Sequence, residues 1–162
     1  MNLVQFSKDL EVPTWLRKFV VGVNIVTFTR PNFPYVPFLI ISRKMEPALR
    51  GFVSYDKGLP FISEDVPVAF RPYFILHELI EFEELNGVGG RCLEALKREL
   101  AFVPKEILQR YIAYRRKFFA GLVTYYALSK HGANAEFKAE IAASLKYLTG
   151  LSGIRRESTV SV

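Results

Sequence analysis

Residues 51–85 read GFVSYDKGLPFISEDVPVAFRPYFILHELIEFEEL, and the character of the sequence changes from strand to helix within this stretch. Two short runs rich in β-branched and aromatic residues, 51–55 and 59–63, flank the triplet Asp56-Lys57-Gly58. Because glycine adopts positive φ without steric cost, this triplet predicts a tight turn between two antiparallel strands. Pro60 has no N–H to give to a ladder, so the second strand is predicted to lie at a sheet edge or to leave its N–H side unpaired.

A long helix is predicted to follow the hairpin directly, over residues 68–85. Ser63 or Asp65 offers a side-chain oxygen that can cap the first turn, and Pro67 or Pro72 is tolerated there because the first N–H groups of a helix have no partner inside it. Asn86 and Gly87 supply the stop, since both residues accept the left-handed conformation that ends many helices. The stretch therefore joins an edge hairpin to a helix that is rich in acidic residues.

The regions on either side of this stretch predict further strands before it and further helices after it. The first third of the chain is rich in β-branched and aromatic residues and predicts strands over residues 20–29 and 36–42. After a glycine-rich link, apolar residues at helical spacing predict a helix that ends near Pro104, a long helix from there to about Lys130, and a last helix over residues 135–148. Strands come first and helices follow, which is the order typical of an α+β protein.

The length suits one compact domain. A chain of 162 residues, half of them apolar, can bury a hydrophobic core. We therefore expect an α+β fold, in which a small antiparallel sheet with an edge hairpin is followed by a helical subdomain, within one domain over residues 1–150. Residues 151–162 have little to bury and are predicted to form a disordered tail.

The charge of the chain indicates possible binding partners, and its cysteine content indicates the cellular compartment. The chain has 22 Lys and Arg against 16 Asp and Glu, a formal net charge of +6, which could favour nucleic acid, an acidic membrane surface or an acidic partner. Arg110, Arg115, Arg116 and Lys117 could supply such a surface on the long helix, although a solvated helix face is the simpler interpretation. The single Cys92 excludes an internal disulfide and, without a visible signal peptide, predicts a reducing, cytoplasmic setting. No apolar run reaches the roughly 18 to 20 residues that cross a bilayer, so no membrane span is expected.

The acidic helix contains His77-Glu78-Leu79-Ile80-Glu81, which differs in one residue from the zinc-binding pattern HExxH. Residues four apart lie on one helix face, so His77 and Glu81 can converge on a single ion. Glu78 is turned by about 100 degrees from His77 and would lie beside the ion, where a general base for an activated water belongs. The same letters also fit an acidic face that water solvates, with His77 hydrogen-bonded at the border of the core.

A catalytic metal site needs a third protein ligand. On the next predicted helix, Cys92 and Glu99 are seven residues apart and therefore share a face. Glu99 offers a carboxylate and Cys92 a thiolate, and the glycine-rich link would let either return to the face of His77 and Glu81. Zinc accepts all of these donors, while a carboxylate in place of the second histidine shifts the preference toward manganese or iron.

With this motif in its strand-to-helix setting, residues 51–85 resemble the core of the zincin-like metallopeptidases, the gluzincin type in particular. In that family an edge strand lies along the substrate, a loop leads into the helix bearing HExxH, and a glutamate from a later helix completes the metal site. The resemblance implies that His77 is the first zinc ligand, Glu78 the general base and Glu99 the downstream glutamate. Glu81 stands where the family has its second histidine, and the resemblance covers about a fifth of the chain.

These observations predict a metal-dependent hydrolase that acts on peptides or proteins with a metal-activated water. One alternative is a non-catalytic zincin-like scaffold that binds an acidic partner or nucleic acid through its basic helical surface. Another is a purely structural metal site that His77, Glu81, Cys92 and Glu99 close between them, with no position left for water. Nothing in the sequence decides the oligomeric state.

Overall fold

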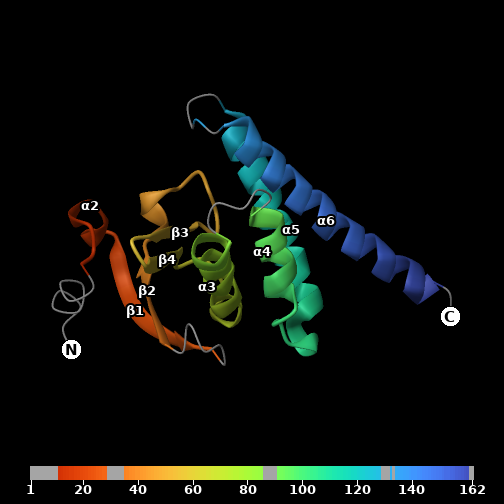
Figure 1. The fold of residues 1–162 in the computed structure, drawn as a ribbon, viewed down its shortest axis with the longest axis horizontal. Helices are drawn as coiled ribbons and strands as arrows, with labels where there is room; N and C mark the ends of the chain where they lie inside the picture. The colour runs from red at the N-terminus through yellow and green to blue at the C-terminus, as the bar shows by residue number, and fades with distance from the viewer. Residues whose placement is uncertain (1–10, 29–34, 86–90, 129–131, 133, 161–162) are drawn as a thin grey trace. The chain divides into compact units, whose positions relative to one another are not determined.

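The computed structural model describes residues 11–28, 35–85, 91–128, 132 and 134–160, with side chains described as far as residue 152 (Figure 1). The chain divides into two compact units, Met1–Glu78 and Leu79–Val162, and the division falls inside one continuous helical run. The first unit contains the strands, and the second contains the long helices that follow them. The fold is therefore α+β, as predicted.

The sheet of the first unit has four strands in the order β1, β2, β4, β3. Their bounds are β1 Val20–Thr27, β2 Tyr35–Ile41, β3 Val53–Asp56 and β4 Leu59–Ser63. β1 pairs antiparallel with β2, and β3 pairs antiparallel with β4, whereas β2 and β4 run parallel. The sheet is thus mixed and not antiparallel throughout, because the chain crosses over after β2, places β3 at the edge and returns as β4 beside β2.

The predicted hairpin is present as β3 and β4, joined by a two-residue turn. Its central residues, Lys57 and Gly58, have φ angles of 48° and 86°. Two successive positive φ angles are characteristic of the type I′ turn, whose twist matches that of the strands it joins. Glycine adopts such an angle without a steric penalty, which is why the triplet around Gly58 predicted the turn correctly.

The strand that contains Pro60 does not lie at the edge of the sheet, because β4 has β2 on one side and β3 on the other. Pro60 is opposite Tyr55 of β3, and the pairing with β2 begins one residue later, at Phe61. The position that has no N–H therefore falls outside the parallel ladder. The edge position that we predicted from Pro60 belongs to β3, while an unpaired N–H side of β4 is consistent with this register.

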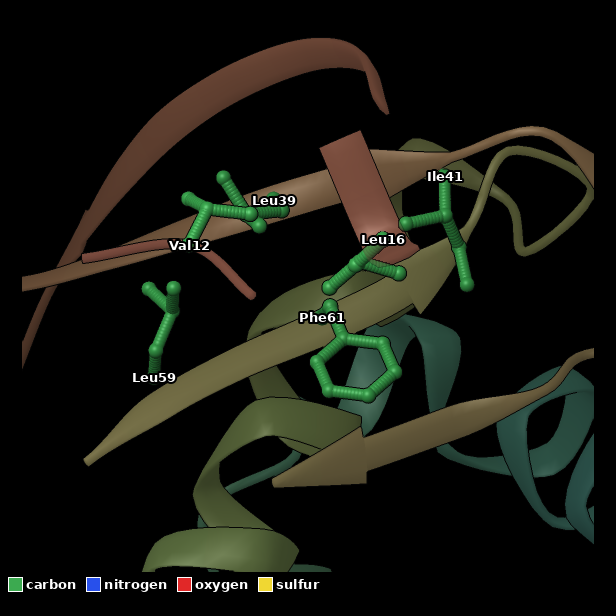
Figure 2. Packing of buried hydrophobic residues seen from close by; sticks show 6 residues of the cluster. All are labelled: Val12, Leu16, Leu39, Ile41, Leu59 and Phe61. Atoms are coloured by element: carbon green, nitrogen blue, oxygen red, sulfur yellow. The ribbon is translucent and has the colours of Figure 1, made fainter. Parts of the chain in front are cut away.

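A cluster of apolar side chains joins the sheet to the short helix α2, Thr14–Arg17 (Figure 2). On β2, Leu39 and Ile41 are two residues apart, as are Leu59 and Phe61 on β4, and alternate residues of a strand point to the same face. The ring of Phe61 also meets Trp15 edge to face, with ring centroids 6.5 Å apart. The buried members of the cluster are Val12, Leu16, Leu39, Ile41, Leu59 and Phe61.

The helix predicted over residues 68–85 is present in three parts. A 3-10 turn, η2 (Val68–Phe70), leads into the α-helix α3 (Arg71–Leu79), which continues as a π-helix, η3 (Ile80–Glu84). The N-cap residue of η2 is Pro67, which makes no side-chain cap hydrogen bond, and the carboxylate of Asp65 accepts a hydrogen bond from the N–H of Gly51 at 3.1 Å. At the start of α3, Arg71 donates to the carbonyl oxygen of Val66 at 2.9 Å. The predicted stop at residues 86–87 and the glycine-rich link lie outside the described residues.

The second unit contains three further helices, α4 (Arg91–Leu100), α5 (Lys105–Ala127) and α6 (Ala135–Val160). Pro104 precedes α5, as predicted. The side chain of Asn134 caps α6 by accepting a hydrogen bond from the N–H of Phe137 at 2.8 Å. The ring of Phe137 meets that of Tyr126 edge to face with centroids 5.1 Å apart, so the end of α5 packs against the start of α6.

The last helix is longer than predicted. α6 continues past Leu148 to Val160, so the backbone of residues 151–160 is helical where the sequence predicts a disordered tail. Gly150 and Gly153 each cost a helix about 1 kcal/mol relative to alanine, but no proline lies within α6 to end it. The single domain expected over residues 1–150 stays a prediction.

Candidate metal centre

The run formed by α3 and η3 is buried on every side along part of its length. All residues from Phe74 to Glu81 are buried, a pattern found in helices of protein interiors. Three of them carry titratable side chains: His77 is 3 % exposed, Glu78 8 % and Glu81 9 %. Burial of a carboxylate is costly because it loses its hydration, so the interpretation of a solvated acidic face does not hold for these three residues.

The helix changes from α to π geometry within the HELIE motif. The N–H of Leu85 donates to the carbonyl oxygen of Ile80, five residues earlier, at 2.9 Å. His77 lies in the last turn of α3, and Glu81 is the second residue of η3. The predicted helix is therefore present, and it has π geometry from Ile80 to Glu84. π turns within helices are rare and occur frequently at functional sites.

Three of the four predicted metal ligands are brought together. His77, Glu81 and Cys92 each present one donor atom, and these atoms all lie within 4.8 Å of one another. Glu81 follows His77 by about one turn of the same continuous helix, and Cys92 lies in the first turn of α4. Zinc with bonds of about 2.0 to 2.3 Å would hold its ligands about 3.3 to 3.8 Å apart. Small side-chain adjustments would therefore close the three donors around an ion.

The donor set also fits a divalent metal in charge and in chemical type. The carboxylate of Glu81 and the thiolate form of Cys92 together carry two negative charges, which balance a divalent cation in a buried setting. Imidazole and thiolate are the donors that zinc prefers, whereas manganese prefers oxygen. The thiol in the group therefore argues against manganese, and the donor set as a whole suits zinc or iron.

Glu78 follows His77 directly and is buried, but it is not one of the three clustered donors. Successive residues of an α-helix are rotated by about 100 degrees, so its carboxylate leaves the helix on a neighbouring face. A general base must lie beside the ion and not on it. The predicted role of Glu78 is compatible with this placement.

Cys92 is held by two contacts between the start of α4 and the helix α6. The hydroxyl of Ser144 donates to the sulfur of Cys92, with the oxygen 3.6 Å from Sγ. One residue later, the N–H of Leu93 donates to the carboxylate of Glu140 at 3.2 Å. The first N–H groups of a helix have no partner within it, so Glu140 satisfies one of them and fixes the first turn of α4.

Glu99 is buried in an ion pair and does not belong to the group of three. Arg115 of α5 donates to its carboxylate through Nη2 at 2.8 Å and through Nε at 3.1 Å, and the hydroxyl of Tyr111 donates to the same carboxylate. None of these three side chains is more than 1 % exposed. This two-pronged arrangement engages both carboxylate oxygens. The structure therefore gives Glu99 a pair that joins α4 to α5, in place of the predicted position beside His77 and Glu81.

The Glu99 network predicts how stability depends on pH. Burial and then the negative charge of Glu99 raise the pKa of Tyr111 well above its ordinary value. The folded chain keeps this proton, whereas the unfolded chain releases it near pH 10. Above about pH 10 the unfolded state thus binds fewer protons, so the free energy of unfolding falls by up to about 1.4 kcal/mol per pH unit. We expect Tyr111→Phe to remove this decrease.

Denaturant unfolding of the wild type and of Tyr111→Phe at several pH values between about 9 and 11 would measure the difference. Tyr35 is 73 % exposed, so Tyr35→Phe is the matched control and should keep the wild-type slope. An equal alkaline slope in the wild type and in Tyr111→Phe would contradict the prediction. The comparison uses slopes because the variant also loses the hydrogen bond to Glu99 and starts from a lower stability.

The basic surface predicted on the long helix loses one of its members. Arg115 is 1 % exposed and pairs with Glu99, whereas Arg110 and Lys117 are exposed and Arg116 is half-buried. Burial by itself lowers the pKa of Arg115, but the charge of Glu99 outweighs this and raises the pKa above its ordinary value. Arg115 is thus a permanently charged interior residue, and the surface left for an acidic partner is smaller than predicted.

The sequence patterns did not reveal the partners of two predicted ligands, Arg115 for Glu99 and Ser144 for Cys92. The burial of Glu99 could have been predicted from helical spacing, because it lies on the same face of α4 as three other residues. All four residues of this face are buried: Cys92, Ala95, Leu96 and Glu99. No local rule connects Glu99 with an arginine 16 residues later on another helix.

Among the helices of the described residues, none combines the length and the apolar character that a membrane crossing requires. Comparisons of the chain with protein-family models, with curated proteins and with solved structures find no match.

Proposed function

We propose that this chain is a zinc-dependent hydrolase whose metal is held by His77, Glu81 and Cys92. The observation that carries the proposal is the proximity of three buried donors of different chemical type, within 4.8 Å of one another. A buried carboxylate and a thiol are costly neighbours when both are ionised, and a divalent cation removes this cost. The motif that supplies His77 and Glu81 also places Glu78 next to them.

Three protein ligands are typical of catalytic zinc sites, which keep the fourth position for water or substrate. A zinc ion held by His77, Glu81 and Cys92 would supply Lewis-acid activation of that water. Glu78 accepts the proton of the water as it attacks the substrate carbonyl, and the same carboxylic acid then donates the proton to the leaving amine. Glu78 and its neighbours on this helix are buried, so its carboxylate is largely screened from bulk water.

Peptides are the proposed substrate class. Among the described residues, β3 pairs with β4 alone, so one side of this edge strand has no strand beside it. An extended peptide can add to such an edge through main-chain hydrogen bonds, which bind any sequence. A thiolate ligand is kept reduced in the cytoplasm, and we propose that the enzyme acts there.

The metal content of purified protein tests the proposal. We expect about one zinc per chain by elemental analysis, as one three-donor site binds one ion. His77→Ala and Cys92→Ala should each lower the zinc affinity by more than the 10- to 100-fold that the loss of an outer hydrogen-bond partner costs. Glu81→Gln should do the same, because an amide oxygen carries no charge to balance the cation.

Glu83→Gln is the matched control, because Glu83 lies on the same π turn as Glu81 but is exposed. This variant should bind zinc as the wild type does. A wild-type chain that stays free of metal after zinc and manganese have both been supplied would exclude the proposal. In that case a salt-dependent affinity for nucleic acid, measured on the same metal-free protein, would favour the binding scaffold.

A further inference from the structure

We propose that Ser144 is a positioning residue of the metal centre, whose hydroxyl group donates a hydrogen bond to the Cys92 thiolate and thereby strengthens zinc binding. This inference rests on the proposed function, because it assigns a second layer to the same site. It adds a residue from α6, a helix that carries none of the three donors.

The first support is the geometry of the hydroxyl. Ser144 is fully buried, and its Oγ lies 3.6 Å from Sγ of Cys92 and 2.9 Å from the backbone carbonyl oxygen of Glu140. A serine hydroxyl has one proton, so it can donate to only one of these two acceptors at a time. Both acceptors lie within reach of this proton, and the sulfur is the one that belongs to a donor of the metal centre.

The second support is the position of Ser144 on its helix. On the buried face of α6 it lies between Ile141 and Leu148, which are 2 % and 0 % exposed. These positions have helical spacing and form one stripe, in which Ser144 is the polar member. Alanine favours a helix more than serine does and would bury no hydroxyl. Packing alone therefore gives no reason for the hydroxyl that faces Cys92.

A second contact from α6 lies one helical turn before Ser144. Glu140 accepts the N–H of Leu93, the residue that follows Cys92. The two contacts hold both the backbone and the sulfur at the start of α4, and an orientation of the donor that exists before the metal arrives reduces the entropy lost on binding. Strengthening comes from this orientation, and a separate effect of the hydrogen bond is to lower the energy of the sulfur lone pair, which the absorption of a bound metal can report.

Cobalt(II) is a probe that reports on this lone pair, because the chain can be loaded with it in place of zinc and a thiolate bound to cobalt gives a charge-transfer absorption band. Ser144→Ala should move this band to lower energy, since the lone pair is no longer stabilised by the hydroxyl. The zinc affinity, measured by competition with a chelator, should fall by about 10-fold. Replacing a residue that served only to pack α6 would leave the energy of the cobalt band unchanged.

Ser152→Ala is the matched control. Ser152 lies on the same helix, and its Oγ donates to the carbonyl oxygen of Leu148 at 3.2 Å, so it deletes the same kind of hydroxyl without a sulfur acceptor. This variant should leave the band and the zinc affinity unchanged. Ser144→Gly, which also removes the hydroxyl, should reproduce the shift seen in Ser144→Ala.

The outcomes separate the two proposals. A cobalt band that disappears in Cys92→Ala but is identical in the wild type and in Ser144→Ala would overturn the role of Ser144 and leave the metal centre intact. A wild-type protein without any thiolate band after cobalt loading would overturn both. A shift of equal size in Ser152→Ala would mean that the helix as a whole and not the Ser144 hydroxyl affects the site, which also overturns the inference.

Discussion

Under the proposed function, replacement of Glu78 by glutamine is expected to abolish hydrolysis and to leave zinc binding intact. Glutamine has nearly the same size as glutamate but cannot accept a proton from water, and a positioned general base contributes about 10²- to 10⁴-fold to the rate. Glu78 lies outside the group of three donors, so its substitution removes none of them. The rate should be measured on a mixture of unstructured peptides, with the metal content of each preparation determined in parallel.

The parallel metal measurement decides between two ways in which this prediction can fail. Wild-type hydrolysis by metal-loaded Glu78→Gln would exclude Glu78 as the base. Loss of zinc from the variant would instead make Glu78 a ligand, and the site would then be closed and structural, because four protein ligands leave no position for water. Glu83→Gln, an exposed change on the same helical run, is expected to keep both the zinc and the rate.

Replacement of Arg115 by methionine is expected to destabilise the fold by about 3 to 5 kcal/mol. Methionine fills much of the volume but leaves the carboxylate of Glu99 fully buried without its cation, and an uncompensated buried charge is among the costliest defects in a protein interior. A loss of this size is a large part of the total stability of a typical domain, which is about 5 to 15 kcal/mol. Denaturant unfolding followed by circular dichroism would measure it.

An exposed ion pair of the same unit provides the control. Arg98 donates to Glu94 at 3.1 Å, but the two side chains are 43 % and 47 % exposed, so Arg98→Met should cost less than about 1 kcal/mol. The double variant Arg115→Met/Glu99→Leu should recover part of the stability lost in Arg115→Met, because it removes the orphaned charge as well. If Arg115→Met costs no more than Arg98→Met, the buried pair does not hold α4 and α5 together.

Local features of the fold were predictable where neighbouring residues create them. The type I′ turn depends on Lys57 and Gly58 alone, and the start of α5 depends on Pro104, so both were predicted correctly. The order of the strands was not predictable, because the parallel pairing of β2 with β4 joins residues more than 20 positions apart. No local sequence pattern in either strand identifies its partner. Pro60 shows this limit, since its missing N–H was compatible with an edge or with an interior position whose ladder begins one residue later.

The candidate site also has features that the sequence predicts and one that only the structure decides. The spacing of His77 and Glu81 places them on one helix face. The spacing of Cys92 and Glu99 places those two residues on one face of the next helix. Which of the last two joins the first pair was open in the sequence. The structure decides between them, because Arg115 donates to both carboxylate oxygens of Glu99, and Cys92 is the residue that lies near His77 and Glu81.

The sequence by itself thus determined a hairpin, a helix that carries the sequence HELIE and a following helix with two candidate ligands on one face. Helical periodicity and turn chemistry act over a few residues, so these features can be recognised without any knowledge of the fold. Only the tertiary structure decided the strand order, the burial of His77, Glu78 and Glu81, and the ion pair of Glu99. Burial and charge pairing depend on which distant segments pack together, and the free energy of that packing belongs to the whole chain and not to any one stretch of it.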